Sequence, residues 1–396
     1  MKSRGYVSGF VLALVLFAFG SAINNSIFSN YLHDVFRYTA EQRGFLELPR
    51  ELPGLLVTFT IGAFFFLSEM RFLGVACLVA SAGIFGVGVL SPTSGSMLFW
   101  VFIWSTGIHV QLVLLERVAM DIGIGKGRGH RLGRMNGLRS FGMILGTVFV
   151  SFIANRFALE YRGMFVTASA AMAVSGILYL ILGNHHATDD VRRVPFVLKA
   201  KYSRYYLLAA LFGIRKQIFI TFAPWFLIKI LDFRAHDIAR VLMVGAAIGI
   251  FAKPLLGRIV DRFGEKRVLT IDGIIIALMS LGYVLFPLFI HGIWLVIICS
   301  ACFILDDLLF TLRTARTTWL VKIADSPEDV TGAMSASVSI DHLLSMSVSW
   351  IAGLAWIHLG YQIVFIVCVV IAVIMSLVST GISVPSPVRQ AAKTGM

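Results

Sequence analysis

Long apolar segments separated by short polar ones make up almost the whole chain. Twelve such segments lie near residues 6–32, 44–68, 71–91, 96–122, 132–155, 162–183, 204–231, 236–257, 267–288, 293–322, 330–357 and 361–384. Each is long enough to cross roughly 30 Å of hydrocarbon as a helix. The segments lack the period-two alternation of a membrane barrel, and backbone polar groups in lipid must be satisfied internally. The pattern therefore predicts an all-α polytopic membrane protein with twelve transmembrane helices.

Composition supports a membrane protein and excludes a soluble domain. The 396 residues are 58% hydrophobic and only 14% charged, with a mean hydropathy of +0.86. A soluble domain of this length could not bury so much apolar surface. The net charge of +13 could indicate a nucleic-acid partner. However, the Lys and Arg residues cluster in short segments between apolar runs, so we expect a lipid bilayer as partner and no nucleic acid.

The distribution of basic residues predicts the orientation. With the N-terminus inside, the cytoplasmic segments hold about 19 Lys and Arg residues and the outer segments about 7, a clear positive-inside bias. We therefore expect a multi-pass protein of the inner or plasma membrane with both termini in the cytoplasm. The cysteines Cys77, Cys299, Cys302 and Cys368 all lie in apolar runs. There they are interpreted as packing residues, because a redox or metal pair is not expected in mid-helix.

A polar stretch at residues 184–203 divides the twelve segments into two groups of six. It predicts a central cytoplasmic loop between an N-terminal six-helix bundle (1–183) and a C-terminal six-helix bundle with a short cytoplasmic tail (204–396). His185 and His186 could bind a metal there, but a solvated linker is the better interpretation. Residues 133–139 align with residues 332–338. Such weak internal repetition is typical of two pseudo-symmetric bundles.

A charged motif lies between the eighth and ninth segments. Gly257, Asp261, Arg262 and Gly264 stand in the order Gly-x-x-x-Asp-Arg-x-Gly, and two basic residues follow shortly after. We expect a very short turn in which the glycines let two helix ends approach closely. Asp261 is expected to cap a helix or to pair with a basic residue, and so to stabilise one conformation. The alternative is a basic turn that only fixes topology.

This motif resembles the loop signature of the major facilitator superfamily (MFS), and the resemblance extends over essentially the whole chain. It implies a secondary transporter in which twelve helices form two six-helix bundles. The equivalent turn between the second and third segments, at residues 66–74, keeps only an acid, an Arg and one Gly. In the family the N-terminal copy is usually the better kept one, so no subfamily is assigned.

Ionisable residues inside the apolar segments are the main candidates for function, because each is costly to hold in lipid and should face a cavity or a partner. The resemblance implies a cavity lined by helices 1, 4, 7 and 10, with helices 2, 5, 8 and 11 beside them. Polar groups on these helices are predicted to bind substrate: Asn24, Asn25, His109, Gln111, Arg215, Lys216, Gln217 and Arg313. Proton coupling is predicted at Asp307, Asp341 and His342.

Other residues are candidates for gating or conformational control. Most lie toward one end of a segment or within the charged motif: Arg50, Glu51, Glu116, Arg117, Arg139, Gly257, Asp261, Arg262, Gly264 and Arg316. The alternative for the charged ones is an interhelical ion pair that only holds the bundle together. Asp272, near the start of the ninth segment, is interpreted as a packed or capping residue.

The favoured function is secondary active transport of a small organic solute by alternating access, coupled to H⁺, with Na⁺ as the less favoured ion. Lys216, helped by Arg215 or Arg313, favours an anionic substrate. The alternative substrate is a cationic or neutral amphiphile exported by proton antiport. Two other classes of function are a receptor or assembly role on the same fold and a membrane-embedded enzyme. The glycine-rich loop at 123–133 follows a membrane helix rather than a strand, so phosphate-binding fingerprints do not apply. We expect a monomer with no enzymatic activity, no cofactor and no bound metal.

The orientation can be tested with the single substitutions Ser94→Cys and Gly127→Cys in a cysteine-free background. An impermeant maleimide added to intact cells is expected to label the first position, because the loop charges place it outside. The second position should label only after the membrane is permeabilised. Labelling of position 127 in intact cells would show that the orientation is wrong.

Overall fold

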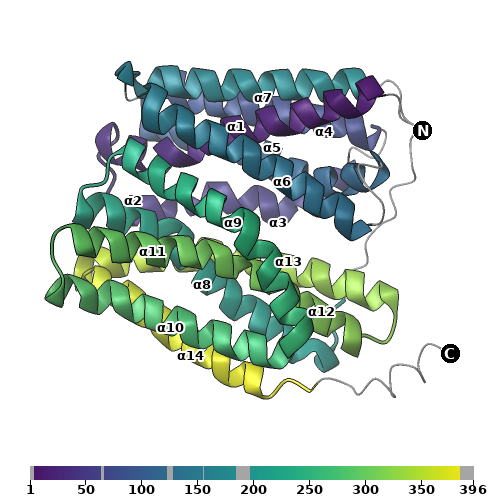
Figure 1. Ribbon diagram of the computed structural model, residues 1–396, viewed down its shortest axis with the longest axis vertical. Coiled ribbons are helices and arrows are strands. Elements are labelled where there is room, and N and C mark those ends of the chain that lie inside the picture. The colour runs from purple at the N-terminus through teal and green to yellow at the C-terminus, as the bar shows by residue number, and fades with distance from the viewer. Residues whose placement is uncertain (1–3, 64–66, 123–127, 155, 184–196, 384–396) are drawn as a thin grey trace. The chain divides into compact units, whose positions relative to one another are not determined.

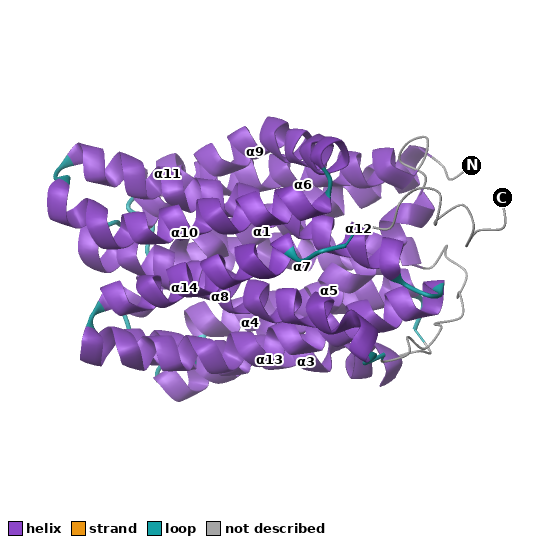
Figure 2. Ribbon diagram, turned by 90° about the horizontal axis from the view of Figure 1, so that it is seen from below, coloured by secondary structure: helices purple, strands orange, loops and turns teal. Residues whose placement is uncertain are grey.

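The computed structural model describes residues 4–63, 67–122, 128–154, 156–183 and 197–383. Within these ranges all regular structure is helical (Figure 2). Eleven of the helices in the described ranges are long and apolar enough to cross a membrane. The prediction of an all-α protein is therefore confirmed, and each helix satisfies its own backbone hydrogen bonds, as a segment in lipid must.

The chain forms two compact units. The first unit comprises Met1–Tyr38, Leu46–Arg192 and Ile228–Ile250. Its helices, seen in Figure 1, are α1 (Arg4–Asp34), α3 (Glu47–Ala63), α4 (Glu69–Val89), α5 (Ser94–Ile122), α6 (Arg128–Val148) with a π-helical continuation (Phe149–Ala154), and α7 (Tyr161–Gly183), together with the end of α8 (Ser203–Leu231) and most of α9 (Ala235–Phe263). Within this unit α4 packs against α5 and α7, and α1 packs against α6 and α7.

The second unit comprises Thr39–Phe45, Arg193–Leu227 and Phe251–Met396. It contains α2 (Ala40–Phe45), a 3₁₀ turn (Ala200–Tyr202), most of α8 (Ser203–Leu231), the end of α9 (Ala235–Phe263), α10 (Glu265–Phe289), α11 (Ile293–Leu309), a second 3₁₀ turn (Phe310–Leu312), α12 (Arg313–Ile323), α13 (Pro327–Leu359) and α14 (Tyr361–Thr380). Here α10 packs along α14, and α13 packs against α2 and α14. The predicted boundary at residues 184–203 stays a prediction.

Two predicted segments differ from the observed helices. The segment at 44–68 is divided into α2 and the 17-residue α3, which carries Glu47, Arg50 and Glu51 and is not among the eleven spans. Pro49 has no backbone N–H to donate, so it fits the first turn of α3 and not the interior of a continuous helix. The segment at 293–322 is helical, but the 3₁₀ turn at Phe310–Leu312 interrupts it between α11 and α12.

The contact between α4 and α7 depends on two glycines. A Cβ atom built on Gly74 would lie 2.9 Å from the carbonyl oxygen of Gly176, and a Cβ on Gly176 would lie 2.9 Å from that of Gly74. Lipid gives helices no hydrophobic reason to associate, so close backbone approach at small residues replaces it. The two glycines therefore set the distance between α4 and α7.

The side chains that point outward suit a lipid surround. Phe59, Phe251 and Phe289 are each more than three-quarters exposed. In water such side chains would form a surface prone to association, whereas in hydrocarbon they are well solvated. Hydroxyl groups within the helices find partners in their own backbone. One example is Ser26, whose Oγ donates to the carbonyl oxygen of Ala22 at 2.7 Å.

A matched pair of substitutions tests the glycine contact. Gly176→Ala is expected to lower the thermal unfolding midpoint in detergent, because overpacking costs about 1–3 kcal/mol. Gly137→Ala on α6 is the control, since a Cβ there meets no described atom within 4 Å. It should be neutral or slightly stabilising. An unchanged midpoint for Gly176→Ala would contradict the packing described.

Candidate functional site

A cavity of about 320 Å³ lies inside the first unit, bounded by α1, α3, α5 and α6. Leu14, Phe17 and Met143 belong to the apolar part of its wall. The wall residues that can make polar contacts are Ser21, Asn24, Asn25, Arg50, Glu51, Trp104, Ser105, His109, Gln111 and Arg139. A mainly apolar cavity with a few convergent polar groups is typical of a small-molecule site.

Arg50 on α3 brings a positive charge to this wall, and acids on the same helix offset it. Its Nη1 lies 2.8 Å from Oε1 of Glu47, whose side chain is fully buried. The charge of Arg50 also interacts with that of Glu51, and its guanidinium lies over the Trp104 ring at 5.8 Å. The i,i+3 spacing places Glu47 and Arg50 on one face of α3, which allows this ion pair within the helix.

On α5, Ser105 and His109 lie one turn apart. Ser105 Oγ donates to the carbonyl oxygen of Arg50 and so connects α5 to α3. Nδ1 of His109 is 2.9 Å from the carbonyl oxygen of Ser105. Because a carbonyl oxygen only accepts, the hydrogen of a neutral His109 is assigned to Nδ1, and Nε2 becomes an acceptor.

Asn24 and Trp104 give the wall unused hydrogen-bonding capacity. Asn24 is 1% exposed and Trp104 is 7% exposed. Neither amide atom of Asn24, nor the indole Nε1 of Trp104, has a hydrogen-bond partner among the described residues. Buried polar groups are normally bonded, so this pair of residues marks the cavity as a place where a polar ligand gains contacts.

In the second unit, two consecutive basic residues of α8 pair with acids on different helices. Nη2 of Arg215 lies 2.8 Å from Oδ1 of Asp306 on α11. Nζ of Lys216 donates to Oδ2 of Asp341 on α13 at 2.6 Å. Arg215 is completely buried. Both predicted substrate-binding cations therefore already have an acidic partner within the unit.

The other residues predicted in this unit lie in several environments. Asp307 is 57% exposed and pairs with Lys253 of α9 at 2.9 Å. Arg316 donates from Nη1 to the carbonyl oxygen of Leu208 at 3.1 Å. Gln217 is buried and bonds to its neighbour one turn along α8, Arg313 is exposed beside the ring of Phe310, and His342 is half-buried on α13.

Of the two interpretations of Asp272, a packed or a capping residue, the structure supports the packed one. Helix α10 begins at Glu265, two turns earlier, and Asp272 is only 2% exposed. Its charge interacts with those of Arg215 and Asp306. It is therefore a buried acid in the interior of α10, and its charge acts on the Arg215–Asp306 pair.

The charged motif is not the turn that the sequence predicted. Helix α9 continues to Phe263, and Gly264 alone separates it from α10, with a φ of 78° that favours glycine. The predicted close approach at Gly257 is wrong for this structure, because a Cβ there meets no described atom within 4 Å. Asp261 is exposed on the last turns of α9.

Sequence reasoning overlooked the buried acid of this junction. Glu265, the first residue of α10, is 3% exposed and lies 2.5 Å from Nζ of Lys322 on α12. An acid in the first turn of a helix is favoured by the helix dipole, so its position was a usable signal. Its basic partner, 57 residues later in the chain, was not predictable.

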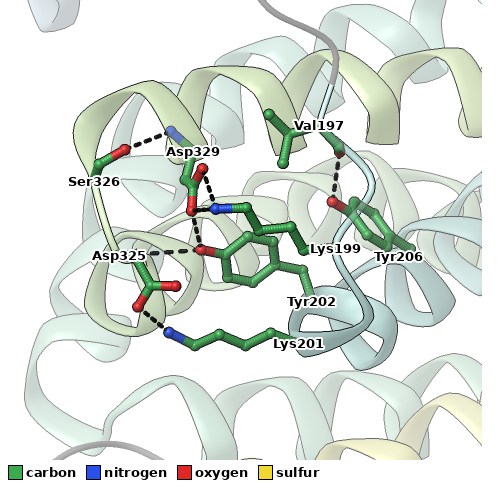
Figure 3. Close-up of polar contacts among 8 residues, drawn as sticks. All are labelled: Val197, Lys199, Lys201, Tyr202, Tyr206, Asp325, Ser326 and Asp329. Carbon is green, nitrogen blue, oxygen red and sulfur yellow. Dashed lines mark hydrogen bonds and ion pairs between the residues drawn. The ribbon is translucent and has the colours of Figure 1, made fainter.

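A second overlooked group joins the segment before α8 to the turn between α12 and α13 (Figure 3). We call it the α12–α13 clasp, and it consists of Lys199, Lys201, Tyr202, Asp325 and Asp329. Nζ of Lys199 donates to both carboxylate oxygens of Asp329, at 2.8 and 2.6 Å. The Tyr202 hydroxyl donates to Asp329 at 2.7 Å and accepts from the backbone N–H of Asp325 at 3.2 Å. Lys201 pairs with Asp325.

The clasp forms at a well-specified helix start. Ser326 Oγ accepts from the backbone N–H of Asp329 at 3.2 Å, and Pro327 is the first residue of α13. Ser at the N-cap followed by Pro is a recognisable sequence signal for this geometry. The hydrogen bonds that Lys199 donates to Asp329 raise the pKa of Lys199 and lower the pKa of Asp329, so the pair stays charged at neutral pH.

The structure brings together part of the predicted site. The substrate-binding candidates of the first unit, Asn24, Asn25, His109 and Gln111, line one cavity with Arg50, Glu51 and Arg139, which were predicted as gating residues. Arg215, Lys216, Gln217 and Arg313 belong to the second unit. The side chains of Glu116 and Arg117 lie outside the described residues. The individual roles stay predictions.

Comparisons with known proteins agree with this architecture. A family profile described as Major Facilitator Superfamily matches residues 10–316. Among similar solved structures, the nucleoside transporter NupG has 13% sequence identity and a TM-score of 0.75, with 95% of this chain and 98% of that chain covered. A D-xylose-proton symporter has 14% identity and a TM-score of 0.69, with 97% and 98% covered.

A bacterial homologue of the iron transporter ferroportin, in its inward-facing state, has 13% identity and a TM-score of 0.71, with 96% of this chain and 98% of that chain covered. At such identities the likeness concerns the fold. Among curated proteins, no match was found by sequence. The predicted twelve-helix transporter fold is confirmed by these structures.

The Glu265–Lys322 pair can be tested against Asp261. Glu265→Gln is expected to destabilise the protein by about 1–3 kcal/mol, because it removes a charged hydrogen-bond acceptor from a buried position. Asp261→Asn, at an exposed position, should have almost no effect on stability. Thermal unfolding in detergent measures both. Equal unfolding midpoints for the two variants would contradict the stabilising role of Glu265.

Proposed function

The chain belongs to the Major Facilitator Superfamily, and we propose that it is a secondary active transporter that moves a small polar organic solute by alternating access, coupled to H⁺. The observation that carries this proposal is the cavity of about 320 Å³ in the first unit. Its wall combines amide, hydroxyl, imidazole and guanidinium groups with an indole ring in an otherwise apolar surround. A small polar solute can exchange its water shell for such a wall.

The wall supports a solute that makes directional hydrogen bonds. Asn24 offers a donor and an acceptor, and Trp104 offers a donor, without a described partner for any of them. The charge of Arg50 is already offset by Glu47. The similar structures include a nucleoside transporter and a D-xylose-proton symporter. Nucleosides and pentoses are polar solutes of this general kind.

The Lys216–Asp341 pair is the proposed coupling element. At 2.6 Å the carboxylate of Asp341 holds the ammonium of Lys216. A proton added to Asp341 removes the negative charge of the pair and makes Lys216 available to another acceptor. Protonation of Asp341 and binding of an acceptor group by Lys216 are then linked within the second unit. Asp307 has its own partner at the unit's more exposed side, which favours Asp341 for this role.

The predicted anionic substrate fits this arrangement in one specific way. An anion can bind Lys216 only by replacing the carboxylate of Asp341, so its binding would favour uptake of a proton by Asp341. A neutral solute in the cavity needs no such replacement. The charge of the substrate therefore determines whether Lys216 contributes to binding. A cationic or neutral amphiphile, the alternative, would leave binding dependent on acids and aromatic rings.

Flux into proteoliposomes with an imposed pH or Na⁺ gradient tests the proposal. We expect a pH gradient, and not a Na⁺ gradient, to drive accumulation of one class in a panel of pentoses, nucleosides, organic anions and cationic amphiphiles. Asp341→Asn should abolish accumulation against a gradient while solute exchange persists, because the exchangeable proton is lost. Asp237→Asn, at the start of α9, is the matched control with full accumulation.

The variant Lys216→Gln separates the substrate classes in the same assay. If the substrate is an anion, its affinity should fall about tenfold or more, since a charged hydrogen bond contributes about 1.5–3 kcal/mol. If the substrate is neutral, affinity should stay within a few-fold of the wild-type value. No transport of any class, or accumulation driven equally well in Asp341→Asn, would contradict the proposed function.

A further inference from the structure

A second cavity, of about 820 Å³, lies at one end of the first unit. It is bounded by the end of α1, the π-helical continuation of α6, the segment 156–160, the start of α7 and the start of α9. The ends of membrane helices lie at the level of the lipid headgroups and not in the hydrocarbon. None of its wall residues belongs to the wall of the cavity of about 320 Å³.

The wall of this second cavity carries charges of both signs. Its acids are Asp34 and Glu160, its bases are Arg162 and Arg234, and His236 is also in the wall. With His236 neutral, the two negative and two positive charges sum to zero. The wall therefore favours neither a simple anion nor a simple cation by its net charge.

Asp34 has a fixed position in this wall. The hydroxyl of Tyr161 donates to its Oδ2 at 2.5 Å, and Nδ1 of His33 lies 2.7 Å from its Oδ1. A carboxylate has about four acceptor sites. Asp34 can therefore accept from a further donor without losing these contacts.

The other three charged side chains of the wall have unused bonding capacity. No ion pair or side-chain hydrogen bond joins Glu160, Arg162 or Arg234 to a residue in the described ranges, and all three are exposed. The backbone around Arg234 is nevertheless held. Its N–H donates to Oδ2 of Asp237 at 3.1 Å, and the preceding carbonyl oxygen accepts from Asn30 of α1 at 2.8 Å. The main chain is thus fixed while the charged groups stay available to a ligand.

One side of the cavity continues into apolar surface. Leu159 belongs to the wall, and Phe157, two residues earlier, is 76% exposed. Phe152 and Ile153, which precede the wall residue Ala154, are half-exposed. In a membrane protein such side chains contact acyl chains. A ligand with a charged head and an apolar tail matches both surfaces.

We propose that this cavity binds a phospholipid whose headgroup carries a phosphate and a primary ammonium group, as that of phosphatidylethanolamine does. Arg162 and Arg234 hold the phosphate, since a guanidinium presents a fork of N–H donors that matches phosphate oxygens. Glu160 and Asp34 accept from the ammonium, and the acyl chains follow the exposed side chains around Phe157. Each charge of the wall then has a partner. The site does not rest on the proposed function.

Other headgroups leave part of the wall unpaired. With an anionic headgroup, such as that of phosphatidylglycerol, Asp34 and Glu160 would face a negatively charged ligand without a cation. A choline headgroup has a positive charge but no N–H to donate to these acids. Free phosphoethanolamine, which dissolves in water, would match the charges but not the apolar surface.

Native mass spectrometry of the detergent-solubilised protein tests the lipid preference. Phosphatidylethanolamine, phosphatidylglycerol and phosphatidylcholine with identical acyl chains are added one at a time. We expect the ethanolamine lipid to bind about tenfold more tightly than the other two, because only it pairs every charge of the wall. Equal binding of the three lipids would overturn the proposal. Displacement of the ethanolamine lipid by free phosphoethanolamine at equal concentration would also overturn it, because the ligand would then be water-soluble.

Two variants separate the two halves of the headgroup. The double variant Arg162→Gln with Arg234→Gln should lower the affinity for the ethanolamine and glycerol lipids about tenfold or more, because the phosphate loses its partners. Glu160→Gln should weaken binding of the ethanolamine lipid alone. The matched control is Arg156→Gln, since Arg156 is exposed on the same segment but does not line the cavity. It should bind all three lipids as the wild-type protein does.

Because the substituted side chains are exposed, the unfolding midpoint without added lipid should equal the wild-type value in all these variants. Unchanged binding of the ethanolamine lipid in the double variant, or an equal loss in Arg156→Gln, would overturn the site. An unchanged lipid preference in Glu160→Gln would overturn the pairing with the ammonium group. None of these measurements requires transport, so a failure of the proposed function would leave them interpretable.

Discussion

An ionised side chain is held in the interior of a membrane protein only with a partner, and this constraint organises the second unit. Arg215 and Lys216 are consecutive on α8, and successive helical residues point about 100° apart. Their acids accordingly lie on two different helices, Asp306 on α11 and Asp341 on α13. The turn of α8 that carries Arg215 and Lys216 is thus held by ion pairs to both α11 and α13. The rings of Phe212 and Phe219 also lie beside the Arg215 guanidinium, at 5.4 and 5.9 Å from their centroids.

The first unit meets the same constraint in another way. There the close pair, Glu47 with Arg50, lies within one helix at i,i+3. A pair of this kind offsets charge without drawing two helices together, and the space between α1, α3, α5 and α6 remains a cavity. The helices of this unit are joined by close approach at small residues, such as Gly74 against Gly176, and by hydroxyl groups such as that of Ser81, which donates to the carbonyl oxygen of Ser169.

Much of the fold could be predicted because apolar length depends only on local sequence. The helices, their approximate limits and the family could all be obtained from residue patterns, and so could the convergence of Asn24, Asn25, His109 and Gln111 on one cavity. The wrong predictions concern residues whose local structure or role depends on contacts with distant parts of the chain. Gly257 was expected in a turn, but helical hydrogen bonding continues to Phe263 because none of those residues prevents it.

Partners distant in the chain were beyond sequence reasoning. Asp272 was judged by its distance from a segment end, whereas its role follows from Arg215, which lies 57 residues earlier on a neighbouring helix. The clasp between Lys199 and Asp329 was overlooked for the same reason. Only its local component, Ser326 capping α13, had a sequence signal. Periodicity identifies a face of a helix but not the helix that covers it.

The single glycine between α9 and α10 has a mechanical consequence. A joint made of Gly264 has essentially two backbone torsions available for bending, far fewer than a loop of several residues would offer. Because only one residue separates them, the end of α9 and the start of α10 cannot translate past each other and can only change their relative angle. Glu265, directly after Gly264, pairs with Lys322, so a change in the angle between α9 and α10 also acts on α12. The one-residue connection therefore leaves the angle between α9 and α10 as the main freedom of this hairpin.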